Sequence, residues 1–351
     1  MKKERKNLIR KEEKMVSEKI KIYVSAELEA IVNKDTESFE FFKSNGVDLN
    51  RNALLTRLIV NYSESFHEKQ RRMIDYMSAR LERQGLKNDS TLKALCFEMS
   101  ERLQNMHSTF ASGKFDRPIS IKPTRASAPT IQYIEGYCLY GASLSEHFRN
   151  MLASYASLPQ DEREKIIFKG ELEKILLAIE QKKKIFITMA NHRSTLVVSP
   201  CRLTSSKEEL HVYLLAGSKD GALPIRLSRI ASVDILSEDA VITEAEAHII
   251  NKMVKYGPQF IYGAYEPQVI VELTHKGVDK FRKLYVHRPV PDKVEGNRYY
   301  FSCSYFQLLN YFLRFGEDAY IVEPKKLRLD IIHFFKRAVK KIYARQDADQ
   351  N

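Results

Sequence analysis

The spacing of hydrophobic residues changes along this chain of 351 residues, and that change is the strongest constraint on its fold. Between residues 25 and 181 apolar side chains mostly recur at helical spacing. From residue 184 onward, short runs rich in Ile, Val, Leu and Tyr are separated by polar turns. Because single hydrophobic cores stop growing at about 250 to 300 residues, we expect an α+β protein of several domains.

The first regular pattern is the alternation KIKIYV at residues 19–24. One face carries Ile20, Ile22 and Val24, and the other carries Lys19, Lys21 and Tyr23. Ser25 is placed to cap a helix that we expect to end at Asn45-Gly46, and a second helix is expected after Asn50, running toward Gly85. Since one strand and two helices cannot bury their own apolar faces, we expect a partner chain to complete this core.

The middle of the chain has a further helical pattern at residues 90–110, followed by GKFDRPISIKPTRASAP. The prolines and small polar residues of that segment predict an extended linker or arm. Helices are expected at residues 142–155 and 160–181, where Glu162 and Glu164 indicate a solvent-exposed face. No internal repeat is detected.

After residue 184 the runs KIFITM, TLVVSP, LHVYLLA and ASVDIL predict the strands of a small barrel. A helix at 243–256 is followed by QVIVELT, RYYFSC and AYIVEP, which alternate with helices at 275–285, 304–315 and 325–345. The last of these helices is basic and amphipathic. We expect it to be a core or dimer helix with a solvated face, although such a helix can also follow a nucleic-acid backbone or a membrane surface.

Composition favours polyanionic partners, because the net charge is +12 and the isoelectric point is about 9.3. The four cysteines are far apart with no C-x-x-C, which indicates reduced thiols rather than disulfides or zinc. Residues 1–18 read as a charged tail, and no run has membrane-spanning length. We therefore expect a cytoplasmic protein with no metal and no cofactor.

Residues 171–236 resemble the WYL domain, an Sm-like barrel of bacterial transcription regulators. The resemblance is carried by LLAIEQKKKI, by Pro200 to Leu203, by Val212-Tyr213-Leu214 and by PIRLSRI at 224–230. Val212 stands where the family has tryptophan, and Met189 replaces a tyrosine often found on an earlier strand. Residues 267–345, with LLNYFLRFGEDAYIVEPKKLR, look like the extension that accompanies WYL domains.

Residues 19–66 resemble the ribbon-helix-helix fold, a DNA-binding dimer in which strands from two chains pair. The combination resembles the WYL accessory proteins encoded beside type VI-D CRISPR systems. It implies an α+β multidomain protein made of a charged tail (1–18), a ribbon-helix-helix module (19–85), a helical and linker region (86–170), a WYL domain (171–240) and a C-terminal extension (241–351) that we expect to dimerise.

Two constellations are candidates for binding nucleic acid. In a paired ribbon, Lys19, Lys21 and Tyr23 face outward, and such a ribbon fits the major groove of duplex DNA. Asn50 and Asn52, at the start of the second helix, could donate to a phosphate. The alternative is a ribbon that only dimerises the protein, with its lysines solvated.

The second constellation is the predicted groove of the barrel, where the WYL resemblance implies binding of single-stranded nucleic acid or a nucleotide. Converging guanidinium groups bind phosphates well, and Tyr213 is the candidate stacking platform, although it also fits a packing role. For Arg226 and Arg229 we prefer binding to the alternative of surface salt bridges. The groove residues are His192, Arg193, Ser194, Arg202, Tyr213, Arg226 and Arg229.

These features predict a non-enzymatic homodimer that captures single-stranded RNA or DNA and, by resemblance, enhances the RNA-guided RNase of a type VI CRISPR system. The alternative is a ligand-responsive transcription regulator that binds duplex DNA through its ribbon. A nuclease ranks last, because no P-loop, nucleophile elbow or H-E-x-x-H is present and the R-x-x-x-x-H pairs occur about as often as chance predicts.

Overall fold

The computed structural model describes residues 19–86, 90–107, 114–139, 141, 143–190, 194–260 and 267–349. The chain divides into two compact units. The first consists of Met1–Lys174 with Leu227–Ala231, and the second of Ile175–Arg226 with Ser232–Asn351. The segment at 227–231, which we assigned to the barrel, therefore belongs to the first unit. The predicted tail at 1–18 lies outside the described residues.

The first unit opens as the sequence predicts, with strand β1 (Ile20–Val24) followed by helices α2 (Ala26–Ser38) and α3 (Arg51–Glu82). Ile22 and Val24 are buried, whereas Lys21 and Tyr23 are exposed. The Oγ of Ser25 accepts a hydrogen bond from the backbone N–H of Leu28 at 3.3 Å, which caps α2. Helix α3 begins after Asn50, as expected.

Helix α2 ends at Ser38, seven residues before the predicted stop at Asn45-Gly46. Phe39 enters the core, and Glu40 adopts a left-handed φ of 60°. Phe42 then pairs with Leu49 in an isolated antiparallel bridge. Phe41, between the end of α2 and this bridge, stacks on Phe168 with ring centroids 5.8 Å apart, so the aromatic residues after Ser38 pack from a turn and not from a longer helix.

Two of our expectations fail at β2 (Arg117–Ile121). This strand lies in the segment predicted to be a linker, and it pairs antiparallel with β1 of the same chain. Ile20 lies opposite Ile121, and Ile22 lies opposite Ile119. The pairing that we expected from a partner chain is therefore supplied within the chain. The linker prediction was wrong because Pro118 inside β2 and Pro123 just after it give the same pattern as an extended arm, although an edge strand tolerates proline.

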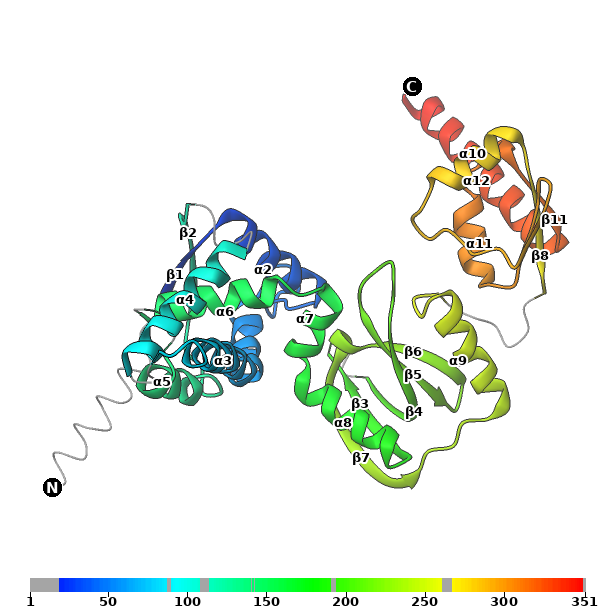
Figure 1. Ribbon diagram of the computed structural model, residues 1–351. Helices are drawn as coiled ribbons and strands as arrows, with labels where there is room; N and C mark the ends of the chain where they lie inside the picture. Colours follow the sequence, from blue (N-terminus) through cyan, green and yellow to red (C-terminus); the bar gives the residue numbers. More distant parts are fainter. Residues whose placement is uncertain are drawn as a thin grey trace. The chain divides into compact units, whose positions relative to one another are not determined.

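Two helices follow β2, α5 (Ala128–Tyr137) and α6 (Leu144–Ala156), and α5 was not predicted. Helix α6 packs against β1 and α2, while α3 packs against β2 and α5 (Figure 1). The order strand-helix-helix thus occurs twice. The repeat escaped detection because α3 has 32 residues and α6 only 13.

The remaining helices of the first unit are α4 (Ser90–His107), α7 (Gln160–Ile167) and α8 (Lys169–Glu180), whose last residues enter the second unit. Phe168 interrupts the single helix predicted at 160–181. Helix α4 packs along α3, with Cys96 and Ser100 buried. Helix α7 is anchored by Arg163, whose Nε and Nη2 each donate to a carboxylate oxygen of the buried Asp35 at 2.7 Å.

The second unit contains a five-stranded sheet in the order β6-β5-β4-β3-β7. Four of its strands were predicted, and β6 was not. Helix α9 covers β5, whose residues Val212–Gly217 are all buried, and contributes Ile249, Ile250 and Met253 to the shared core. Closure of the sheet into a barrel stays a prediction. The strands are β3 (Lys183–Met189), β4 (Thr195–Ser205), β5 (Val212–Ser218), β6 (Gly221–Arg226) and β7 (Ile230–Asp239), with α9 at Glu244–Tyr256.

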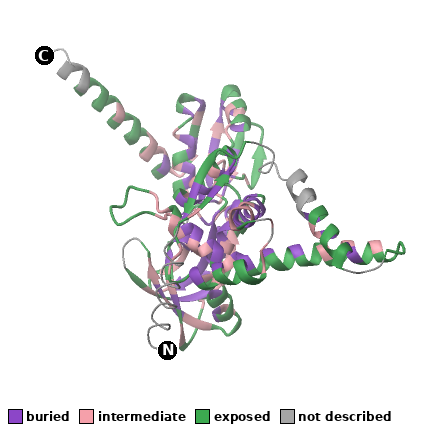
Figure 2. Cartoon of the chain, turned by 90° about the vertical axis from the view of Figure 1, so that its left-hand side faces the viewer, coloured by how far each residue is buried: buried purple, intermediate pink, exposed green. Residues whose placement is uncertain are grey.

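The C-terminal part of this unit is an α/β module, as predicted, with a sheet in the order β11-β8-β10-β9. Its core is rich in aromatic residues, including Phe301, Tyr311 and Phe312. The part of α12 that leads to the C-terminus is mostly exposed (Figure 2). The elements are β8 (Val269–Leu273), α10 (His275–Lys283), β9 (Lys293–Glu295), β10 (Arg298–Phe301), α11 (Tyr305–Phe312), η2 (Gly316–Asp318), β11 (Ala319–Glu323) and α12 (Lys325–Asp349).

Candidate nucleic-acid interface

The ribbon formed by β1 and β2 has an apolar inner face and a polar outer face. Lys21 lies opposite Ser120, and Tyr23 lies opposite Pro118. All four side chains are exposed, and Tyr23 is 48% exposed. Neither strand contains Asp or Glu. Lys19 precedes β1 and Lys122 follows β2, so both extend the outer face at the end where Ile20 pairs with Ile121.

The two asparagines at the start of α3 have structural partners. The Oδ1 of Asn50 accepts the backbone N–H of Ala53 at 3.2 Å and caps the helix. The side chain of Asn52 makes two bonds to the backbone of Lys122, accepting its N–H at 2.8 Å and donating to its carbonyl at 3.1 Å. Asn52 therefore holds α3 against the end of β2, and a contact of Asn52 with phosphate stays a prediction.

Three of the predicted groove residues share one face of the sheet in the second unit. Tyr213 lies opposite Thr204 on β4 and opposite Arg226 on β6, and Arg202 is two residues from Thr204. Arg202 is exposed and Arg226 is half-buried. Tyr213 is only 8% exposed, packs with α9 residues, and donates its hydroxyl to Glu209 Oε2 at 2.6 Å. Its ring therefore packs in the core and offers no stacking surface.

Arg229 lies in the 3-10 turn η1 (Leu227–Arg229). Its Nε donates to Glu40 Oε1 at 2.9 Å, so the structure shows a salt bridge. The adjacent Ser228 donates its backbone N–H to Glu164 Oε1 at 3.0 Å, and Glu164 is completely buried rather than solvent-exposed as predicted. Because Arg226 belongs to the second unit and Arg229 to the first, the two arginines are not part of one compact unit.

The remaining groove residues were expected at the turn between β3 and β4. His192 and Arg193 lie outside the described residues. Ser194 is exposed, and its carbonyl accepts the backbone N–H of Met189 at 2.9 Å. Ser194 is eight residues from Arg202, or about 26 Å along an extended strand, so these two predicted groove residues are not brought together.

A cavity of about 650 Å³ lies at this end of the sheet. It is bounded by the first residues of β4, the turn between β5 and β6, and the start of α9. Two lysines line it: Lys184 is paired with Glu238 at 2.8 Å, and Lys219 lies in the turn between β5 and β6. The α9 N-terminus is capped by its own Thr243 and Glu246, so Glu238 and Glu246 would compete with an anion for Lys184 and for this helix end.

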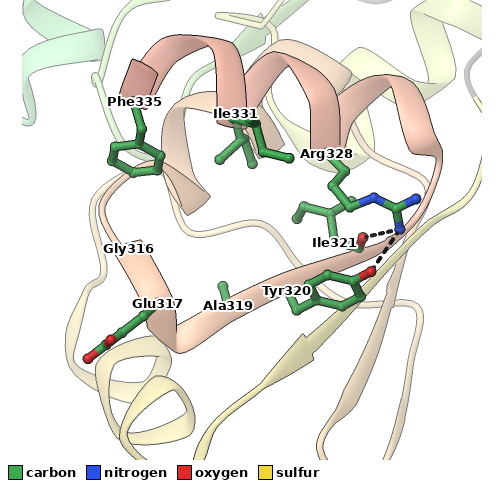
Figure 3. Close-up of a pocket in the computed structure, with 9 residues that line it drawn as sticks. Gly316, Glu317, Ala319, Tyr320, Ile321, Arg328, Ile331 and Phe335 are labelled. Carbon is green, nitrogen blue, oxygen red and sulfur yellow. Dashed lines mark hydrogen bonds between the residues drawn. The ribbon is translucent and has the colours of Figure 1, made fainter. Parts of the chain in front are cut away.

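A second hollow lies beside α12, and no sequence signal indicated it. The groove, of about 390 Å³, is lined mainly by apolar side chains of β11 and α12 (Figure 3). Phe335, Ile331 and Ile332 form the helical side, and Tyr320 with Ile321 forms the strand side. Arg328 Nη1 donates to the Tyr320 hydroxyl at 3.1 Å and to the Ile321 carbonyl at 3.2 Å. These bonds fix the end of the groove.

Among the described residues, no group of three or more His, Cys, Asp or Glu side chains is placed to hold a metal ion. Within the same ranges no helix is long and apolar enough to cross a membrane. Cys96, Cys138, Cys201 and Cys303 are unbridged.

Together these elements define an α+β protein with a doubled strand-helix-helix unit, a five-stranded sheet capped by a helix and a C-terminal α/β module. Its fold resembles that in a crystal structure of a CRISPR Cas-related protein, with a TM-score of 0.62 and 19% sequence identity over 94% of this chain and 95% of that one. At this identity the match shows a shared fold.

A second structure, proteasome accessory factor B/C (PafBC) of Arthrobacter aurescens, is 16% identical and covers 66% of this chain and 38% of its own. Its TM-score of 0.24 carries no structural argument. No protein-family model and no curated protein sequence matches the chain.

Proposed function

We propose that this chain is a non-enzymatic nucleic-acid-binding protein that serves a CRISPR system as an accessory factor. The observation that carries the proposal is the ribbon of β1 and β2, whose outer face bears lysines and a tyrosine and no acid. A two-stranded ribbon has the width of the major groove. Lysine and tyrosine side chains can donate to phosphates and base edges there, and the net charge of +12 favours approach to a polyanion.

The test is binding to fluorescent duplex DNA, single-stranded DNA and single-stranded RNA across a salt series. We expect the Lys21→Ala/Tyr23→Ala variant to lose duplex affinity by tenfold or more and to show a shallower salt dependence. Arg71→Ala, which removes an exposed cation of α3 with a distant carboxylate contact of 3.8 Å, is the matched control. Equal duplex affinity of the double variant and the parent protein would refute this use of the ribbon.

Single-stranded RNA is the second proposed ligand, and its site is the sheet of the second unit. Arg202 and Arg226 support this site, because they lie on the same face of the sheet, on β4 and β6 at either side of β5, and Arg202 is exposed. The Arg202→Ala/Arg226→Ala variant should bind RNA less tightly while duplex binding stays at the parental level. Arg229→Ala is the informative comparison, since its guanidinium is engaged by Glu40. RNA binding that depends on Arg229 alone would contradict the assignment.

The CRISPR role rests on the shared fold with the CRISPR Cas-related protein and on the sequence resemblance to accessory proteins of type VI systems. The proposed action is to raise the cleavage rate of an RNA-guided RNase by capturing RNA. The assay is cleavage of a reporter RNA by a type VI-D effector with and without this protein. A rate that is unchanged by the wild-type protein, or is changed equally by the Arg202→Ala/Arg226→Ala variant, would count against it.

Homodimerisation is the last part of the proposal. Since β1 pairs within its own chain, the self-association surface must lie elsewhere, and α12 offers one. Exposed apolar residues continue from the groove along the helix through Phe335, Val339 and Ile342. The same helix therefore supplies both a groove and a ridge, as an isologous contact between two copies requires. The ridge is flanked by Lys336, Arg337, Lys340 and Lys341, and Glu317 lies at the groove.

A further inference from the structure

The first compact unit contains the strand-helix-helix order twice, and a local two-fold arrangement relates the two copies. In the register of the ribbon, Ile22 and Ile119 form the central pair, with two further pairs on each side. The helices repeat this relation, because α6 packs on β1 and α2 whereas α3 packs on β2 and α5. The chain thus contains within itself the arrangement for which two chains are otherwise needed.

On the inner face the centre of the ribbon keeps this symmetry, because the local two-fold relates Ile22 to Ile119 and Val24 to Ile121, and all four are buried. The half-buried Ile20 is instead related to the exposed Arg117, and the outer face departs from the symmetry throughout. On the outer face, the local two-fold relates Lys21 to Pro118 and Tyr23 to Ser120. The two strands therefore present different chemistry to a ligand.

The two ends of the outer face also differ in chemistry. Lys19, Lys21 and Lys122 gather toward the end where Ile20 pairs with Ile121, with Ser120 beside Lys21. Tyr23 and Pro118 face each other at the opposite end. A ribbon with a cationic end and an aromatic end has only one favourable direction along an asymmetric partner.

We propose that one chain supplies a complete reading ribbon, which binds a single non-palindromic site in duplex DNA. The inference rests on the proposed duplex binding and adds strand β2 to the reading face, through Ser120 and Lys122. A ribbon of two identical strands reads two half-sites related by a two-fold axis. Because the strands here differ, no symmetry of the protein requires symmetry of the DNA.

The pairing is tested without nucleic acid, with the Lys21→Cys/Ser120→Cys variant. Directly opposed residues of an antiparallel pair have Cα atoms about 4.5 to 5.5 Å apart, within the range of a disulfide. Mild oxidation should produce a disulfide within one chain, seen as the loss of both introduced thiols in a protein that still runs as a monomer on a non-reducing denaturing gel. The Lys21→Cys/Pro118→Cys variant is the control, since its diagonal positions are about 7 to 8 Å apart and should not bridge.

A disulfide-linked dimer of the Lys21→Cys/Ser120→Cys variant, or no bridge between these cysteines, would overturn the single-chain ribbon. Each single-cysteine variant reports any contribution from the four native thiols. Because the cross-linking test needs no DNA, it shows whether β1 and β2 pair within one chain even if the protein binds no duplex.

Recognition of a non-palindromic site by one ribbon is tested by selecting preferred sites from randomised duplex DNA. We expect a non-palindromic consensus with one ribbon per site, and we expect Lys122→Ala to weaken binding about as strongly as Lys21→Ala. A palindromic consensus occupied by two ribbons, or parental affinity of Lys122→Ala and Ser120→Ala, would overturn the proposal. If the intrachain disulfide forms and no duplex is bound, the proposed duplex function fails while the single-chain ribbon stands.

Discussion

At the scale of single residues, Asp35 shows how the first unit is held together. Its carboxylate is fully buried and accepts two bonds from Arg163 and one from the Tyr155 hydroxyl at 2.8 Å. Burial, and then the Asp35 carboxylate, holds the pKa of Tyr155 well above its usual value, so this hydroxyl stays a donor. Arg163 also donates to the Leu158 carbonyl at 2.6 Å. The network joins α2 to α6 and α7.

We expect Asp35→Asn to lower the free energy of unfolding by about 3 to 5 kcal/mol, because it leaves the Arg163 guanidinium buried without its counterion. Equilibrium urea unfolding measures this change. Asp48→Asn is the matched control, since Asp48 pairs with Lys43 at an exposed site and should unfold like the parent. Similar unfolding curves for the two variants would contradict this account of Asp35.

His147 makes the stability of the same unit depend on pH. Burial, with a smaller effect from His67, lowers the pKa of the His147 imidazole from 6.5 to about 4. Between these values the unfolded chain binds a proton that the folded chain excludes. Stability is therefore retained above pH 6.5 and falls as the pH drops toward 4, by at most about 3 kcal/mol.

The measurement is the unfolding free energy at several pH values between 7 and 4. His147→Gln should reduce the slope of unfolding free energy against pH, because up to one fewer proton is taken up on unfolding. This holds whatever the effect of the substitution on absolute stability. His67→Gln replaces an exposed histidine and should keep most of the slope. An unchanged slope in His147→Gln would show that other groups cause the acid sensitivity.

At the scale of elements, the sequence predicted those whose hydrophobic period lasts for several turns or alternations. Helices α3, α6, α9 and α12 and strand β1 were anticipated, and their boundaries mostly agree. Strand β2 and helix α5 were missed, because Pro118 lies within the five residues of β2, Pro123 follows them, and the strand is defined by its long-range partner. Local pattern cannot report pairing between residues about a hundred positions apart.

The candidate site was harder to predict for the same reason. Asn52 and Glu164 looked like solvent-facing groups, but each bonds to backbone atoms distant in sequence. The alternation around Tyr213 fits both a stacking role and a packing role. Only the position of α9 shows that the ring is covered. The outward side of β1 was predictable, since period-two alternation itself separates Lys21 from Ile22.

A close approach between elements gives the third prediction, at Gly277. A Cβ on this residue of α10 would lie 2.2 Å from the backbone carbonyl oxygen of Asp318 in η2. Gly277→Ala must therefore separate α10 from η2, and we expect a loss of about 1 to 3 kcal/mol in unfolding free energy. Gly170→Ala is the opposite case, because a Cβ in α8 would meet nothing within 4 Å. It should add roughly 0.5 to 1 kcal/mol.

Both variants can be followed by equilibrium unfolding, with hydrogen exchange to locate the change. Loss of protection in Gly277→Ala should concentrate in α10 and β8, which contact each other. A Gly277→Ala protein as stable as the parent would show that α10 can shift freely. Destabilisation by Gly170→Ala would show that α8 is constrained in a way that the space around Gly170 does not indicate.

At the scale of the whole molecule, self-association through α12 is the remaining prediction. Phe335 lines the groove (Figure 3). Its side chain is 37% exposed, and Ile342, two turns further along α12, is 58% exposed. Phe335→Glu places a charge at the centre of the proposed contact, where its desolvation would oppose association. We expect sedimentation velocity to show a dimer for the parent and a monomer for this variant. Tyr285→Glu, at an apolar position 70% exposed outside the groove, should remain dimeric.

The Phe335→Glu variant also separates dimerisation through α12 from duplex binding by the ribbon. If duplex DNA is read by one ribbon per chain, monomeric Phe335→Glu should keep its affinity for a short duplex with one site and lose only the gain from two linked sites. Parallel loss of dimer and single-site binding would instead mean that the ribbon needs a second chain. Because Lys21 and Ser120 oppose each other within one chain, we expect affinity for the single site to be retained.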